Sequence, residues 1–217
     1  QRSLVGSEMC IRDSISRVEI NSKSTEILAE REKIIDFVMN ANLKTTSNEF
    51  LDNAKTNGFD FQLNFKYGKH PTFDSSDKEY VYWHNGNMIS VKDINCNMYL
   101  SLDYNALNTS IFYDDLLLTT KEVDTINNLK VGDSISKLYE KSLIYKASAI
   151  SKIYYANDNL GNPKYSLYPC MTFVIDKKGQ TYKTIDISVS DGKISKICEP
   201  IEHKKEYETG FNFFIRS

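Results

Sequence analysis

Apolar residues recur every three or four positions over residues 24–40, and charged residues fill the positions between them. At this spacing Ile27, Ile34 and Val38 share one helical face. Such a stripe is typical of a helix that packs one side on a core and leaves the other side in water. The pattern therefore predicts an amphipathic helix of about four turns over this range.

A second helix is indicated shortly after the first. Thr46 and Glu49 have the spacing of a capping box, in which each side chain bonds the backbone amide of the other residue. Phe50 and Ala54 then supply an apolar face, and Gly58 is a typical residue at a helix end. We expect a short helix between Thr46 and Gly58.

The spacing of apolar residues changes from helical to alternating at Phe59. Apolar and polar residues alternate strictly from Phe59 to Tyr67, which predicts a half-buried strand. Strand-like runs at 80–84 and 87–91 flank Asn85-Gly86, a dipeptide that favours the tight turn of a β-hairpin. Further strands are predicted at 98–104 and 111–118.

The second half of the chain opens with another short helix and continues in strands. Near Val131 the spacing turns helical, Asp133 or Ser134 can cap the helix, and Leu138 and Tyr139 line one face with Ile135. Turn residues rich in Gly, Asn and Asp separate the runs that follow. Strands are predicted at 149–155, 168–176, 182–189 and 193–198.

This order of elements predicts an α+β fold: antiparallel meander sheets with helices packed on one face, in two similar halves. Strands joined by turns of a few residues must pair antiparallel, because a parallel pair needs a long crossover. Residues 15–118 would hold helices plus antiparallel strands, and residues 119–217 a short helix plus an antiparallel meander. The pattern leaves open whether the halves share one sheet.

Composition narrows the classes of partner. Hydrophobic residues make up 41% of the 217 residues and charged residues 26%, which is typical of a folded chain. The net charge of -2 disfavours nucleic acid as the partner. No apolar run reaches the length of a membrane span. Lys204 and Lys205 stand among glutamates, which favours a solvated surface stretch.

No catalytic, cofactor or metal motif is visible. The cysteines and histidines lack metal-ligand spacing, and the glycine-rich and nucleophile motifs of common enzymes do not occur. Asp103, Asp114 and Asp115 are interpreted as solvated turn acids. Cys170 and Cys198 lie in apolar runs and are interpreted as small buried residues, or as a disulfide pair in an exported protein.

One hairpin carries the candidate partner-binding residues. Tyr80, Tyr82 and His84 share one face of a strand, and Val81 and Trp83 share the other. Aromatic side chains on a hairpin can form a rigid contact surface for a glycan or a protein. We expect Val81 and Trp83 to face the core and Tyr80, Tyr82 and His84 to be available to a partner.

Two segments resemble known sequences. Residues 1–14, QRSLVGSEMCIRDS, resemble translated sequencing-adapter read-through, which implies that native sequence starts near Ile15.

The second resemblance covers residues 119–198. Thr119-Thr120, then LKVGDSI at 129–135, resemble a segment of uncharacterised exported proteins and lipoproteins of low-GC Gram-positive bacteria, and 171–176 and 190–197 are similar to its closing strands. The resemblance implies a helix-on-antiparallel-sheet module similar to those of the beta-lactamase inhibitor protein and the small outer-membrane assembly lipoproteins. It carries no catalytic residues. Tyr139 is followed by Glu140, where that group has glycine.

The leading functional hypothesis is a non-enzymatic, extracytoplasmic or cell-envelope bacterial module that binds an unknown protein or glycan. One alternative is an intracellular phage or mobile-element protein of the immunity type. The other is an enzyme whose site is assembled from scattered residues.

Overall fold

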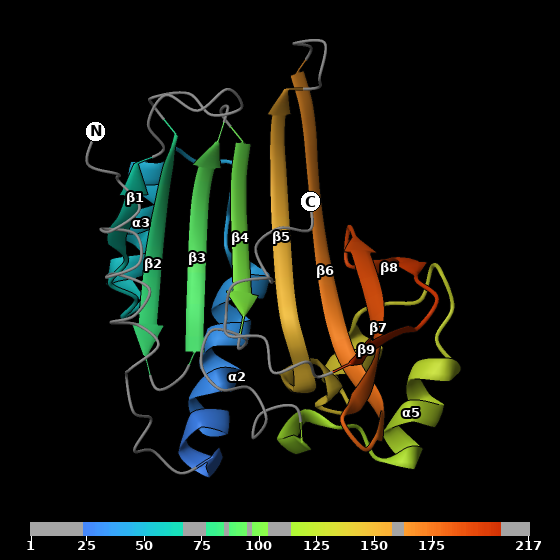
Figure 1. The fold of residues 1–217 in the computed structure, drawn as a ribbon. Coiled ribbons are helices and arrows are strands. Elements are labelled where there is room, and N and C mark those ends of the chain that lie inside the picture. Colours follow the sequence, from blue (N-terminus) through green and yellow to red (C-terminus); the bar gives the residue numbers. More distant parts are fainter. Residues whose placement is uncertain are drawn as a thin grey trace, which may run out of the picture.

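The computed structural model describes residues 24–66, 77–84, 87–94, 97–103, 114–157 and 163–204 (Figure 1). Nine strands form one antiparallel sheet in the order β1 to β8, with β9 paired to β7. The strands are β1 (Gln62–Lys66), β2 (Lys78–His84), β3 (Asn87–Ile94), β4 (Asn97–Asp103), β5 (Ala147–Asn157), β6 (Pro163–Lys178), β7 (Thr181–Ser190), β8 (Lys193–Ile197) and β9 (Ile201–Lys204). The helices are α2 (Ser24–Asn40), α3 (Ser47–Thr56), α5 (Thr120–Asn127), α6 (Ser136–Tyr139) and the 3-10 helix η1 (Leu143–Lys146).

The predicted α+β class is confirmed, and the two halves share one sheet. Strand β4 of the first half pairs with β5 of the second, with Leu102 opposite Ile150. Every pairing between described strands is antiparallel. A connection of a few residues requires this, as between β6 and β7, whereas β4 and β5 pair antiparallel across a long connection that holds helices.

Helix α2 builds the core over the middle of the sheet. Its bounds are those predicted from the spacing of apolar residues. Ile34, Ile35 and Val38 are buried in the same cluster as Leu100 of β4 and Ile150 of β5. Figure 1 shows α2 and α3 covering the same face of the sheet. Burial of this stripe is the main force that holds α2 in place.

Helix α3 begins at the predicted capping box. The Thr46 hydroxyl accepts from the Glu49 amide at 3.3 Å, and the Glu49 carboxylate accepts from the Thr46 amide at 3.0 Å. That backbone hydrogen bond is the main cause that lowers the pKa of Glu49. Phe50 and Ala54 are buried, as their spacing predicted. The capping box fixes the start of α3, and the burial of Phe50 and Ala54 holds the helix against the core beside α2.

The strand predicted from Phe59 is shorter than the alternation indicated. It begins at Gln62, and a register shift falls between Leu63 and Phe65. Leu63 is 47% exposed, whereas Phe59 is buried and Phe61 packs against the core. Packing of Phe59 and Phe61 with the aromatic residues of the helices overrides strand geometry at the start of the alternating run.

The connection between the halves differs most from the prediction. Asp114–Leu116 is helical, so the strand predicted at 111–118 is wrong over its described part, 114–118. Helix α5 was not predicted. It starts at a capping box of Thr119 and Glu122, the signal already used for α3.

The helix predicted near residue 131 is a single turn, α6. Its N-cap residue, Ile135, makes no capping hydrogen bond through its side chain. Asp133 instead accepts from the Lys130 amide at 2.9 Å, and Ser134 Oγ accepts from the Ser136 amide at 3.2 Å. The two predicted caps therefore stabilise the turn before α6.

Candidate binding groove

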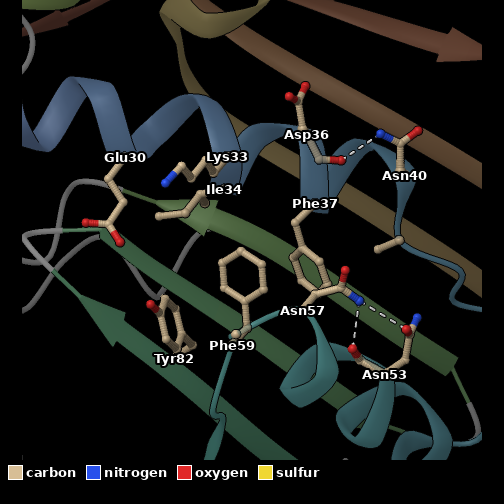
Figure 2. Close-up of a pocket in the computed structure, with 12 residues that line it drawn as sticks. Glu30, Lys33, Ile34, Asp36, Phe37, Asn40, Asn53, Asn57, Phe59 and Tyr82 are labelled. Carbon is tan, nitrogen blue, oxygen red and sulfur yellow. Dashed lines mark hydrogen bonds between the residues drawn. The ribbon is translucent and has the colours of Figure 1, made fainter.

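A groove of about 610 Å³ lies between α2, the end of α3 and β2 (Figure 2). One wall is a stripe of residues on α2 that continues to the residue after the helix. The opposite wall is formed by the last turns of α3 and the residues directly after it, and Tyr82 of β2 completes the groove from the sheet. The stripe spans Glu30 to Asn40, about 15 Å along the helix axis. The lining residues are Glu30, Lys33, Ile34, Asp36, Phe37, Asn40, Ala41, Asn53, Asn57, Gly58, Phe59 and Tyr82.

The helical period explains how α2 serves both the core and the groove. Residues three, four and seven positions apart lie on one face of a helix, so Lys33, Phe37 and Asn40 follow one another along the groove. Ile35 and Val38 lie on the adjacent face and are fully buried. The helix therefore presents charged, aromatic and amide side chains in series while its other side is fixed to the sheet.

Three aromatic rings form the apolar part of the groove. The Phe37 and Phe59 rings are stacked with centroids 4.2 Å apart, and the Tyr82 ring meets Phe59 edge to face at 5.2 Å. Figure 2 shows these three side chains grouped between α2 and β2. Rings packed so closely support one another and leave no gap between them for an inserted group. A ligand would contact the rings of Phe37 and Tyr82, which are only partly buried, while the buried Phe59 ring supports them.

Two asparagines at the far end of the groove have a fixed orientation. Asn40 Nδ2 donates to the Asp36 carbonyl oxygen at 2.8 Å. Asn57 Nδ2 donates to the Asn53 carbonyl oxygen at 2.8 Å and to Asn53 Oδ1 at 3.1 Å. A backbone carbonyl accepts only, so these bonds set which side-chain atom is the nitrogen. Both asparagines therefore hold their carbonyl oxygens away from the helix ends.

Charged groups at the groove have mixed sign. Glu30 and Lys33 lie at the end opposite the asparagines (Figure 2). The Asp36 carboxylate turns away from the rings and accepts from the Tyr145 hydroxyl at 3.3 Å. Burial, followed by the negative charge of Glu30, raises the pKa of Tyr82. The Tyr82 hydroxyl is therefore neutral at physiological pH.

Lys152 on β5 fixes the end of the α2 wall. Its side chain is buried, and Nζ donates to the Met39 carbonyl oxygen at 2.7 Å and to the Ala41 carbonyl oxygen at 2.8 Å. A cation is favourable beside these carbonyls because they carry the negative end of the helix dipole. Burial lowers the pKa of Lys152 to about 8. The lysine ties the end of α2, and with it Asn40 and Ala41, to the sheet.

The structure describes the side chains of two of the three predicted partner-binding residues, and it places them differently. Tyr82 lines the groove, whereas Tyr80 packs against the core and does not line it. The side chain of His84 lies outside the described residues. Tyr80 and Tyr82 pack against the core in place of Val81, so the expected orientation is wrong at these three positions, and the side chain of Trp83 lies outside the described residues. Their amphipathic rings fill the space under α2 and α3.

Most of the groove was not predicted. Phe37 and Phe59 had been placed only on a helix and a strand, and Asn40 and Asn57 were not singled out. One usable signal was present, because an asparagine at the end of each helix can turn its amide back to the last carbonyls. That the ends of α2 and α3 lie at the same groove depends on packing between segments far apart in the sequence, which local patterns do not indicate.

The two cysteines described do not pair. Cys170 and Cys198 are free. Cys170 lies on β6, Cys198 directly follows β8, and β7 lies between these two strands. The Cys198 amide donates to the Asp186 carbonyl oxygen of β7 at 2.9 Å. Strands two places apart are separated by about 9.6 Å, beyond the roughly 7 Å that a disulfide can span. Burial, followed by the charge of Asp186, raises the pKa of Cys170, so its thiol is protonated at neutral pH.

Other candidate chemistry does not assemble into a site. Over the part of the chain that the structure describes, no group of His, Cys, Asp or Glu side chains is placed to hold a metal ion. Asp114 forms an ion pair with Lys177 and accepts from the Tyr182 hydroxyl at 3.2 Å. The Asp103 side chain lies outside the described residues. None of the described helices is both long and apolar enough to cross a membrane.

Comparisons of the chain with protein-family models, with curated proteins and with solved structures gave no match. An assignment of function therefore depends on the groove and its chemistry.

Proposed function

We propose that this chain is a non-enzymatic binding module that holds its ligand in the groove between α2 and β2. The observation that carries the proposal is the placement of three packed aromatic rings beside asparagines whose amide nitrogens are held by helix carbonyl oxygens. Binding sites for small ligands are concave, with apolar walls and a few placed polar groups, and their volumes fall in this range.

The groove is built on rigid elements. Helix α2 is fixed along its length by Ile35 and Val38 and at its end by Lys152, and α3 is fixed at its start by the Thr46 capping box. Because these walls are already ordered without a ligand, binding costs little further conformational entropy of the protein. The Tyr82 ring is likewise supported by Phe59 and Phe61.

The proposal also places the chain outside the cytoplasm, in the bacterial envelope or beyond it. Its support is the resemblance over residues 119–198 to exported proteins and lipoproteins. The upstream genomic sequence tests this part, because a signal peptide or lipobox supports export and a plain methionine start favours the immunity-type alternative.

Nuclear magnetic resonance tests the groove directly. The ¹⁵N-labelled protein is titrated with neutral oligosaccharides and, separately, with short synthetic peptides, and the backbone amides are followed. We expect one of these probes to give saturable shifts that centre on Asn40, Asn57 and Tyr82. Shifts that centre elsewhere, or no saturable shifts with either panel, would overturn the proposal.

A further inference from the structure

We infer that the ligand of the groove is a neutral carbohydrate. This inference rests on the proposed binding function and names the chemical class that the lining residues fit. It follows from the hydrogen-bonding atoms, the apolar surface and the charges of the groove.

The hydrogen-bonding atoms include both acceptors and donors. The amide nitrogens of Asn40 and Asn57 are used by their own helices, so their Oδ1 atoms are presented as acceptors. The oxygen of Asn53 already accepts from Asn57, so its Nδ2 is presented as a donor. Within the described part of the chain, these three atoms make no other hydrogen bond. A hydroxyl group donates and accepts at once, so neighbouring hydroxyls on one ring match such a set.

The aromatic rings suit the apolar side of a sugar. A pyranose presents its C–H groups on one face and its hydroxyls around the edge. Phe37 and Tyr82 are only partly buried and line the groove together with the asparagines, so one ligand can meet both (Figure 2). The stacking of Phe37 on Phe59 at 4.2 Å closes the space that an aromatic cage for a quaternary ammonium group would need.

The charges of the groove oppose a strongly ionic ligand. Glu30 and Lys33 have opposite sign at one end. At the other end the Lys152 ammonium group offsets the negative end of α2. The Asp36 carboxylate is engaged by Tyr145 and turned outward. The lining side chains carry an excess of only one negative charge, from Glu30, Lys33 and Asp36, so the groove gives little electrostatic preference to a phosphate or to a basic peptide.

The test compares Asn57→Ala with Asn128→Ala, a matched control. Asn128 follows α5 as Asn57 follows α3, and its Nδ2 donates to the Asp124 carbonyl oxygen at the same 2.8 Å, but it lies outside the groove. The two substitutions remove the same helix-end bond. Only Asn57→Ala also removes an acceptor from the groove, together with the hydrogen bond that orients the Asn53 amide there.

Affinity is measured by titration calorimetry with cello-, malto- and chito-oligosaccharides and with short peptides as the competing class. We expect at least one oligosaccharide to bind saturably, with affinity reduced roughly tenfold by Asn57→Ala and unchanged by Asn128→Ala. If no sugar binds, but a peptide binds and Asn57→Ala weakens its binding, the carbohydrate assignment is overturned. The groove would then still be the binding site. Equal effects of the two variants on the affinity for a bound sugar overturn both proposals, as does the absence of any binding.

Discussion

The ammonium group of Lys152 lies 2.8 Å from the carbonyl oxygen of Ala41, so the middle of β5 is joined to the residue that follows α2. The two residues are 111 positions apart in the chain. Like the hydrogen bonds of Arg31 and Asp36 with Tyr145, this contact links the first helical segment to the second half of the molecule, and it also holds a wall of the groove. A buried lysine at such a position has consequences for stability that can be measured.

We expect Lys152→Met to lower the free energy of unfolding by about 1–3 kcal/mol at pH 7. Methionine has a similar length but no donor, so the Met39 and Ala41 carbonyls lose a buried partner. Urea denaturation followed by circular dichroism measures the change. A variant as stable as the parent would show that these two bonds do not hold the end of α2.

The same pair of proteins should differ in pH dependence. The pKa of Lys152 is about 8 in the folded state and 10.5 for an unburied lysine, so the unfolded chain binds the proton more tightly. The cost of burying the charge is fully present below pH 8 and is relieved between pH 8 and 10.5. The stability of the parent relative to Lys152→Met should therefore rise over that window. A constant difference from pH 7 to 10 would contradict this account.

Glu122 at the start of α5 should stabilise the fold only while it is ionised. Burial tends to raise its pKa, but hydrogen bonds from Lys146 and Thr119 outweigh this effect and lower it below 4.5. The contribution of the ionised Glu122 to the free energy of unfolding is fully present above pH 4.5 and is lost as the pH falls through the pKa of Glu122 in the folded state. We expect Glu122→Gln to cost about 0.5–1 kcal/mol at pH 7 and progressively less as the pH falls below 4.5. Thermal denaturation at pH 7 and at acidic pH measures the change.

Glu140→Gln serves as the control for that comparison. Glu140 is exposed at the end of α6 and shares none of the Glu122 contacts in the described part of the chain. Its replacement should leave stability unchanged at both pH values. If both variants lost the same stability at pH 7, the loss would come from the general surface charge and not from the contacts of Glu122 with Thr119 and Lys146.

Cys170 and Cys198 should not form a disulfide with each other in the folded protein. Strand β7 separates them, and closing the bond would require it to move. Non-reducing peptide mapping after air oxidation should find no cross-linked peptide that joins these two residues. Detection of that peptide in protein that retains its native circular dichroism spectrum would contradict the strand order at this edge.

Local signals predicted much of the fold. The spacing of Ile34 and Val38 predicted α2, and Thr46 with Glu49 predicted the start of α3. Strand-like runs separated by turn residues predicted the central strands. The equivalent capping signal of Thr119 and Glu122 was overlooked, so α5 was missed.

The groove could not be predicted from local patterns. Strand alternation places Tyr80 and Tyr82 on one face and Val81 and Trp83 on the other, and the prediction had Val81 and Trp83 facing the core. In the fold the tyrosines fill the space under two helices whose positions depend on contacts such as Lys152 with Ala41. Strand β9 was missed for a similar reason. Residues 201–203 are exposed, so its pairing with β7 leaves no hydrophobic pattern.

The most direct test of the groove is a matched pair of tyrosine truncations. Tyr80 and Tyr82 lie two residues apart on the same face of β2, and only Tyr82 lines the groove. Both variants are first shown by circular dichroism to be folded, and each is then titrated with the tightest ligand found for the parent. We predict that Tyr82→Ala weakens binding at least roughly tenfold while Tyr80→Ala leaves it within about twofold. Equal affinities of the two variants for that ligand would contradict the assignment of the groove as the binding site.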